Sequence, residues 1–429
     1  MIKLALIANQ KESLELFLNF FNKNKTKIEK LSSQKLEIKY IYDVSDQNKI
    51  EYFLAASLNK IELIKDYQSL INTAEIDIII ELERKFNSAD YLLQALKNKK
   101  IVITSNHKVL AENYLILKKA EAEFNTKLFF SASFSPLPVK TLIDNFYALD
   151  EVTEINAVLN ATTNYILSEM GKNTVSMKET VEQAKEASYT EDNPELDLSG
   201  SDSLNKSILM TELIFNKAFD FSAVSSRGIK GITSYDLIYA AELGYKIKLI
   251  CTIKKEKGKL YLGVRPNLIS EDSFLADVNE NSNGIEIISN YNSKVIFKAE
   301  NNDLAPLNLL SQDLIKAARI RGGYDKVLLE EPGLNENKLI DLYQHQENSF
   351  YVRLQLEKDK KIIENIKKIF SEKNLADLIL HDDLTETPLL PVIIITKEIK
   401  EKVLEKLLKE VENVEGVLTV NNVIAVKTH

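Results

Sequence analysis

The polar segment EDNPELDLSGSDSLNK (191–206) carries side chains whose types and spacing could do chemistry. Asp202 and Lys206 are four residues apart, so on a helix they lie on one face. Leu209 extends that face, and a charged pair leading into an apolar stripe suits a helix that lines a cleft. Glu191 adds a second carboxylate just upstream. Such groups can transfer protons or bind charged molecules, although an Asp–Lys pair at this spacing is, taken alone, usually a solvated salt bridge.

Residues 1–135 have the pattern of a Rossmann-like domain. The apolar run IKLALIAN (2–9) predicts a buried strand, and an amphipathic helix follows it. Strands that alternate with helices indicate a doubly wound parallel sheet. A helical run near 302–320 is expected to return to this domain. The other predicted strands are LEIKYIYDV (36–44), EIDIIIELE (75–83), IVITSN (101–106) and KLFFSAS (127–133).

The rest of the chain predicts two further parts and a linker. Residues 136–300 mix long helices with strands, as in an α+β substrate-binding and dimerisation domain. Residues 321–348 are polar and rich in glycine, proline and asparagine, so they are predicted to be a linker. The C-terminal tail, residues 349–429, has the order strand, helix, strand, strand, helix, strand. This βαββαβ order predicts a ferredoxin-like unit, so the fold class is α/β throughout.

Composition and charge narrow the class of protein. A chain of 429 residues is long enough for two or three domains. The net charge of −8 argues against nucleic acid or an anionic membrane as partner. One cysteine, Cys251, excludes an intrachain disulfide, and the four histidines show no metal-ligand spacing, so no metal site is predicted. The apolar runs are too short for a signal peptide or a membrane span, and a cytoplasmic location is expected.

Four segments of the middle domain together resemble the homoserine dehydrogenases. LNATTNYILSEM (159–170) is similar to the family's N-G-T-T-N-Y-I-L. Residues 189–206 match Y-x-E-x-D-P followed by D-x-x-G-x-D-x-x-x-K, with Asn for the first Asp. Residues 227–250 look like E-G-I-x-x-I-x-x-x-D-I-x-x-A-x-x-L-G-Y-x-I-K-L, with Arg in place of the Glu. Residues 265–285 look like H-P-x-L-I-x-x-x-x-P-L-A-x-V-x-x-x-x-N-A-I, with Arg in place of the His.

The resemblance implies hydride transfer between NAD(P)H and the aldehyde carbon of aspartate 4-semialdehyde, which gives homoserine for threonine and methionine biosynthesis. Lys206 would stabilise the oxygen that gains negative charge, or donate a proton to it. Glu191 and Asp202 would bind the ammonium group of the substrate, and Asp202 would also position Lys206. His107 stands where the family has the lysine of T-A-N-K, which implies a role in proton transfer.

The expected cofactor site departs from the family pattern. The family has G-x-G-x-x-G after the first strand, whereas this chain has no glycine before Gly171. A Rossmann turn uses glycines so that the backbone can approach the pyrophosphate. The NAD(P) contacts are therefore predicted at degenerate positions, namely Ala8, Asn9, Ser13, Asp43 and Asn106. In addition, Ser131 replaces a glutamate that helps the family bind a monovalent cation, which argues against that cation here.

Two interpretations of these departures remain open at the level of sequence. In the first, the chain is an NAD(P)-dependent homoserine dehydrogenase that holds its cofactor through other contacts. In the second, it is a catalytically dead homologue that has lost nucleotide binding and serves as an amino-acid-binding, regulatory or assembly subunit. Nicotinamide-cofactor binding discriminates between them.

The tail is similar to the ACT module, which in metabolic enzymes often binds an amino-acid effector. The module usually has D-x-P-G between its first strand and first helix, where an effector carboxylate meets the helix N-terminus. This chain has EKDKK (357–361) instead, without proline or glycine. Threonine is therefore expected to bind weakly or not at all, and dimerisation is an equal expectation for the tail. A homodimer with a small-molecule substrate is predicted overall.

Overall fold

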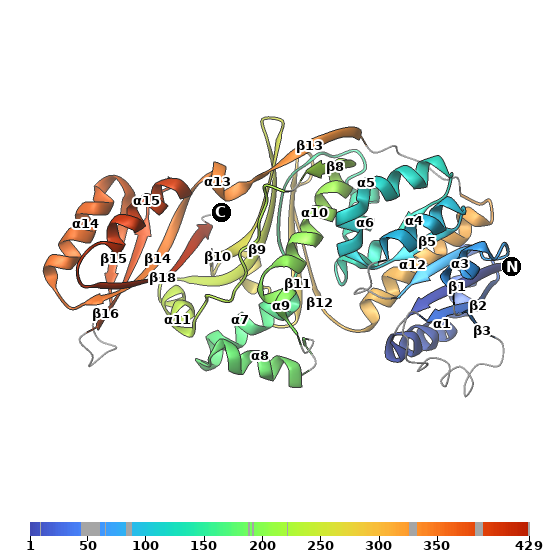
Figure 1. Cartoon of the computed structure of the whole chain (residues 1–429), viewed down its shortest axis with the longest axis horizontal. Helices are drawn as coiled ribbons and strands as arrows, with labels where there is room; N and C mark the ends of the chain where they lie inside the picture. Colours follow the sequence, from blue (N-terminus) through green and yellow to red (C-terminus); the bar gives the residue numbers. More distant parts are fainter. Residues whose placement is uncertain are drawn as a thin grey trace. The chain divides into compact units, whose positions relative to one another are not determined.

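The computed structural model describes residues 1–8, 10–43, 61–64, 66–82, 88–187, 189–190, 193–220, 222–325, 333–381 and 389–427. Two predicted site residues, Asn9 and Glu191, lie outside these ranges. The chain forms two compact units. Unit 1 contains Met1–Asp150, Ile208–Asp220 and Glu300–Asn337, and unit 2 contains Glu151–Ser207, Phe221–Ala299 and Lys338–His429. Figure 1 shows the elements of both units in sequence colours.

Unit 1 is built on a six-stranded parallel sheet in the order β3-β2-β1-β4-β5-β6. This is the order of a Rossmann sheet, which confirms the predicted fold of this part. The strands are runs such as IIIE, buried at every residue, as expected for strands covered on both faces. Their bounds are β1 (Ile2–Ala8), β2 (Leu36–Asp43), β3 (Glu62–Ile64), β4 (Ile78–Glu81), β5 (Ile101–Thr104) and β6 (Leu128–Phe129).

Helices α1 and α12 share one hydrophobic core with the strands of unit 1. Helix α1 buries Leu14, Phe17, Leu18 and Phe21, the spacing of an amphipathic helix, and α12 packs beside it, as the sequence predicts. The helices are α1 (Lys11–Ser32), α3 (Tyr67–Asn72), α4 (Ala89–Lys97), α5 (His107–Glu123), η1 (Ser131–Phe134), α6 (Val139–Thr141), η2 (Leu142–Phe146) and α12 (Leu304–Arg321). Helix α10 (Ser201–Phe215) begins in unit 2 and ends in unit 1, where β8 (Lys217–Asp220) follows.

Unit 2 is organised around one long mixed sheet with the order β12-β11-β7-β9-β10-β18-β14-β16-β15. Its strands before the tail are β7 (Val152–Val158), β9 (Tyr245–Glu256), β10 (Lys259–Ser270), β11 (Ser282–Ser289) and β12 (Ser293–Glu300). Its helices before the tail are α7 (Ala161–Asn173), α8 (Met177–Glu186), α9 (Glu195–Leu198), α11 (Ser234–Glu242) and η3 (Phe274–Asp277). The first half of α10 also belongs here.

The tail has the predicted βαββαβ order. Its elements are β14 (Glu347–Glu357), α14 (Lys360–Asn374), β15 (Leu375–Leu380), β16 (Leu389–Thr396), β17 (Ile399–Lys400), α15 (Glu401–Glu412) and β18 (Val417–Lys427). The neighbours in β18-β14-β16-β15 all pair antiparallel, which is the ferredoxin-like arrangement. Strand β18 also pairs in parallel with β10, so the tail sheet continues the middle sheet.

The segment 321–348, predicted to be a linker, differs from that prediction over its second part. It contains β13 (Gly333–Asp341), which pairs with β10 through 339–341, and α13 (Leu342–His345). The hydroxyl of Tyr343 contacts Asn267 on β10, and both residues are buried. Backbone pairing and buried contacts outweigh the polar composition of this segment, so the tail and the middle domain form one unit.

Buried ion pairs join the tail to the middle domain. The guanidinium group of Arg353 on β14 donates to both carboxylate oxygens of Asp236 on α11, at 2.6 and 3.1 Å. Arg265 on β10 donates to Glu401, the first residue of α15, at 2.6 Å. A buried pair of this kind costs several kcal/mol to break by removing one partner. The tail is therefore fixed to the middle domain by specific contacts.

Glu212, in the part of α10 that belongs to unit 1, gives a pH-dependent prediction. Burial raises the pKa of its carboxyl group to about 9, against the effect of the Phe219 amide that donates to it. The native state then holds a proton that the unfolded state loses above its ordinary pKa, so stability falls as pH rises from about 4.5 toward 9. We expect Glu212→Gln to flatten this decline. Melting temperatures from pH 5 to 9 check it, and equal slopes for both proteins would contradict it.

Among the described residues, no helix is long and apolar enough to cross a membrane.

Candidate active site

The first turns of α7 and α10 bring together a cluster of polar side chains in unit 2. Asn160 is the N-cap of α7 and accepts a hydrogen bond from the amide of Thr163. Its own amide nitrogen donates to Asp197 at 2.6 Å and to Asp202 at 2.9 Å. Two carboxylates therefore converge on one asparagine, in a position where a cationic group could bind between them.

Lys206 completes this cluster. Its ammonium group lies 2.7 Å from Asp202 and 3.3 Å from the carbonyl oxygen of Leu159. The Lys206 and Asp202 side chains are only 13% and 16% exposed, so this pair is not an ordinary solvated salt bridge. An ammonium group has three donors, and the described residues use two of them, which leaves one for a substrate oxygen. The structure thus places the predicted pair Asp202 and Lys206 side by side.

The turn before α10 is held by two glycines. Gly200 has a φ of +79°, a conformation that favours glycine, and its position starts α10 at Ser201. Gly228 packs against the same turn so closely that a Cβ there would lie 1.8 Å from the carbonyl oxygen of Leu198. The amide of Ile229 donates to that oxygen at 2.9 Å. The 226–232 loop thus fixes the turn that precedes Asp202.

A buried cysteine of β9 packs against α10. Cys251 on β9 is buried, and its thiol contacts the carbonyl oxygen of Ser203 at 3.8 Å. Burial raises the pKa of the Cys251 thiol to about 12. A thiol with such a pKa is inert at neutral pH, as the sequence predicts for a buried cysteine.

From the sequence alone, no site role was assigned to Asn160, Asp197 or Lys248. The first two stand inside the matched motifs, so their place in those motifs was the available signal. Lys248 lies in the strand YKIKLI, where alternation places it on the face opposite to Ile247 and Leu249, so its burial was not evident from the sequence. Its ammonium group donates to the side chain of Asn164 and to the carbonyl oxygen of Val278, at 2.8 and 2.6 Å. Burial lowers the pKa of Lys248 to about 7.

The predicted cofactor residues of unit 1 lie along the carboxyl edge of its sheet. Ala8 and Asp43 end the neighbouring strands β1 and β2 and are register partners. Asn106 follows β5 and caps α5, accepting from the amide of Val109. Ser13 lies in the first turn of α1. Ligands of doubly wound sheets bind at this edge, so these residues lie where a dinucleotide could bind.

The N-terminus of α1 meets this edge beside β1. Gln10 is the N-cap residue with an extended backbone, and its side chain makes no capping hydrogen bond to the helix amides. Helix amides that no side chain caps can receive a phosphate. Glu81, at the end of β4, is buried and accepts a hydrogen bond from Thr104 at the end of β5. The switch point between β1 and β4 therefore has the architecture of a nucleotide site, although glycine is missing.

His107 and Ser131 also belong to unit 1. His107 is the first residue of α5, and its amide donates to the carbonyl oxygen of Ser105 at 3.0 Å. It is thus in a different unit from Lys206. Ser131 donates through its amide and its hydroxyl to the buried Asp313, at 2.7 and 2.6 Å. Burial raises the pKa of Asp313 to about 6. In the described part of the chain, no three acidic, histidine or cysteine side chains are grouped to hold a metal ion.

Comparisons with known proteins agree with this geometry. The family model "Homoserine dehydrogenase" matches residues 138–306, and the model "Homoserine dehydrogenase, NAD binding domain" matches residues 16–131. The chain is 28% identical to a homoserine dehydrogenase of Helicobacter pylori over 364 residues, which is 83% of this chain and 84% of that one. It is 24% identical to the Neisseria gonorrhoeae homoserine dehydrogenase over 397 residues, 91% of this chain and 90% of the other.

Solved structures give the same answer for the fold. The crystal structure of a homoserine dehydrogenase from Thiobacillus denitrificans has a TM-score of 0.87 at 19% identity, covering 99% of this chain and 98% of that one. The S. aureus homoserine dehydrogenase has a TM-score of 0.76 at 25% identity, covering 100% and 99%. The Rossmann sheet and the matched NAD-binding domain define an NAD(P)-dependent oxidoreductase. With both halves matched, the chain belongs to the homoserine dehydrogenase family.

Proposed function

We propose that this chain catalyses the NAD(P)-dependent interconversion of aspartate 4-semialdehyde and homoserine, a cytoplasmic step toward threonine and methionine. The observation that carries the proposal is the cluster of Asn160, Asp197, Asp202 and Lys206, which stands in the matched family domain. The alternative of a dead regulatory homologue gains no support, because the NAD-binding half matches the family as well as the catalytic half.

In the proposed mechanism, Lys206 acts on the reacting oxygen. A bound nicotinamide cofactor would supply or accept the hydride. As the aldehyde is reduced, its oxygen gains negative charge, which the remaining donor of Lys206 stabilises before the proton is transferred. Asp202 and the Leu159 carbonyl hold the ammonium group, so its direction is fixed before substrate arrives.

The same cluster would bind the amino-acid end of the substrate. Asp197 and Asp202 converge on Asn160 and offer carboxylate oxygens to the substrate ammonium. Glu191, outside the described residues, is assigned to this group as well. On the cofactor side, Ala8, Ser13, Asp43 and Asn106 would line the dinucleotide, and His107 would take part in proton transfer.

The purified chain tests this proposal directly. With homoserine and NAD+ or NADP+, we expect NAD(P)H absorbance to rise, and we expect no rise when homoserine is omitted. Cofactor must be supplied up to millimolar concentration, because side chains stand at the glycine positions of the Rossmann turn. Absence of homoserine-dependent reduction at saturating cofactor would overturn the proposal.

We also propose a homodimer formed through the middle domain. Strand β12 is the end strand of the long sheet, with β11 as its neighbour, and its residues alternate between exposed and half-buried. An edge strand of this kind can pair with a second copy about a two-fold axis. Light scattering should therefore report twice the chain mass of 48.8 kDa. A stable monomer at all concentrations would contradict this proposal.

The ACT-like tail is proposed to take no effector at the usual helix N-terminus. Asp359 is the N-cap of α14, and its carboxylate accepts from the amide of Lys361 at 2.8 Å. A side-chain carboxylate thus already occupies the position that an effector carboxylate would need, and it repels a second anion. This supports the expectation that threonine binds weakly there.

A further inference from the structure

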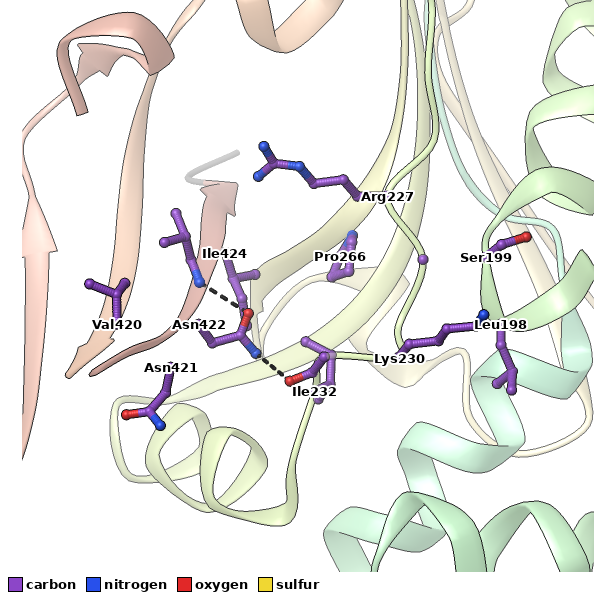
Figure 2. A pocket seen from close by; sticks show the side chains of 13 residues that line it. Leu198, Ser199, Arg227, Lys230, Ile232, Pro266, Val420, Asn421, Asn422 and Ile424 are labelled. Atoms are coloured by element: carbon purple, nitrogen blue, oxygen red, sulfur yellow. Dashed lines mark hydrogen bonds between the residues drawn. The ribbon is translucent and has the colours of Figure 1, made fainter. Parts of the chain in front are cut away.

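A cavity of about 380 Å³ lies in unit 2 between the tail and the middle domain, outside the catalytic cluster. We call it the tail cavity. In Figure 2, the 420–424 stretch of β18 forms one wall and the 227–232 loop the other, with Pro266 between them. The turn at Leu198 and Ser199 closes one side. Volumes in this range suit a small molecule.

The charges on the lining residues of the tail cavity favour an anionic ligand. Arg227 and Lys230 line the cavity, and none of its lining residues is acidic. The Arg227 side chain is 53% exposed and contacts Glu401 at 3.0 Å through one nitrogen, so most of its five donors remain. Arg265 shares the same Glu401 oxygen, which divides the carboxylate between two guanidinium groups. Lys230 is half-exposed in an ion pair with Glu195.

Backbone donors add to this charge. The amides of Arg227, Ile229 and Ile232 donate to backbone carbonyl oxygens. Within the described chain, the intervening amides of Gly228, Lys230 and Gly231 donate to no protein acceptor. Short loops with such amides and neighbouring cations are anion-binding concavities.

Much of the remaining lining is aliphatic, beside the polar side chains of Ser199, Asn421 and Asn422. The aliphatic part consists of Leu198, Ile232, Pro266, Val420, Val423 and Ile424. A bare inorganic anion would leave this surface without a partner, whereas a carboxylate with a short aliphatic body would cover it. We propose that the tail cavity binds a small carboxylate-bearing molecule with a short aliphatic body, and that its occupancy changes the affinity for substrate. The second part rests on the function proposed above.

Backbone contacts connect the tail cavity to the substrate carboxylates. The occupant would contact both the 227–232 loop and the Leu198–Ser199 turn. These two segments are in backbone contact, through the Ile229 amide on the Leu198 carbonyl and the Ser226 hydroxyl on the Ser199 carbonyl, at 2.9 and 3.1 Å. That turn leads into the first turn of α10, which carries Asp202. A shift of the loop is therefore transmitted to the substrate carboxylates.

Calorimetry on the full chain tests binding without any need for catalysis. Isobutyrate is the probe, and isobutyramide is the matched neutral compound, which we expect to bind at least about tenfold more weakly. Inorganic phosphate should also bind more weakly than isobutyrate. L-Valine distinguishes two sources of the carboxylate: tighter binding than isobutyrate indicates an amino acid, and equal or weaker binding indicates a simple carboxylic acid.

Three variants locate the site. Arg227→Gln removes the cation, and Gly231→Leu fills the cavity, since a Cβ at Gly231 would meet no atom within 4 Å. Both should weaken isobutyrate binding at least about tenfold. Lys178→Gln makes a matched charge change on α8, away from the cavity lining, and should leave binding unchanged. Unaltered binding in both cavity variants, equal binding of phosphate, or no isobutyrate binding to the wild type would overturn the site.

Linkage tests the coupling separately. A saturating probe should change the homoserine dissociation constant about fivefold or more, and saturating homoserine should change that of the probe by the same factor. Arg227→Gln should abolish both effects. Probe binding with no change in homoserine affinity would refute the coupling alone, and absence of homoserine binding would count against the proposed function instead of the site.

Discussion

We expect turnover to fall at least about a hundredfold when Lys206 is replaced by alanine, the usual scale for loss of a positioned proton donor. Lys206 donates to Asp202 at 2.7 Å and to the carbonyl oxygen of Leu159 at 3.3 Å, and the alanine side chain has no donor to replace it. The fold should persist, because Asp202 keeps its hydrogen bond from Asn160. Steady-state kinetics and circular dichroism on the same sample measure both properties.

Two controls separate a catalytic role of Lys206 from a structural one. Asp202→Asn keeps the shape of the partner but removes its charge, so it should raise the KM for homoserine as well as lower kcat. Lys178→Ala removes an exposed lysine of α8 and should leave both constants unchanged. Near-normal kcat in Lys206→Ala would place the reaction elsewhere in the chain.

The sequence predicted the architecture well where local pattern and global fold agree. Buried runs such as IIIE of β4 could only be strands covered on both faces, and their alternation with amphipathic helices left a doubly wound sheet as the consistent fold. The helical run near 302–320 was expected to return to the first domain, and α12 packs in the core of unit 1. The βαββαβ order of the tail was visible for the same reason.

The second part of the segment 321–348 was less predictable, because tertiary contacts decide its structure. GLNENKLID is polar and would not form a strand alone, yet it becomes β13, with Leu339 as register partner of Leu260 on β10. The burial of Arg265 and Arg353 was hidden as well. Each arginine is acceptable inside only because an acidic partner, Glu401 or Asp236, arrives from a distant part of the sequence.

The proposed catalytic cluster was predictable in part. Asp202 and Lys206 share a helix face by spacing alone, whereas Asn160 reaches them from another helix, and its role follows only from the three-dimensional arrangement. Asn160 serves two purposes at once, since its oxygen caps α7 while its nitrogen holds the two carboxylates. A cap residue in a sequence gives no sign of such a second contact.

The carboxyl edge of the unit 1 sheet is the basis for a prediction about NAD(P)H affinity. We expect NAD(P)H to bind about a hundredfold more weakly than the micromolar range, which is about 2.8 kcal/mol at 1.4 kcal/mol per tenfold. Backbone amides at a helix N-terminus hold the pyrophosphate when no side chain intervenes. In this chain Ala8, Gln10 and Ser13 stand at the three glycine positions of the motif, and Glu12 adds negative charge to the first turn of α1.

Matched variants of α1 test this explanation of the weak binding. Gln10→Gly should tighten NADPH binding, because the extended backbone of Gln10 needs no side chain to hold it and the pyrophosphate could then approach. Glu12→Gln should also tighten it, more at low than at high salt, whereas Glu15→Gln, one turn further along the exposed face, should change little. Fluorescence titration with NADPH and NADH measures all four proteins. Because the substrate cluster lies in unit 2, kcat at saturating cofactor should remain at the wild-type value, and only the KM for the cofactor should fall. Two results would contradict this explanation: micromolar NADPH binding by the wild type, or unchanged affinity in both Gln10→Gly and Glu12→Gln. Either result would mean that other contacts hold the pyrophosphate as strongly as a glycine-rich Rossmann turn does.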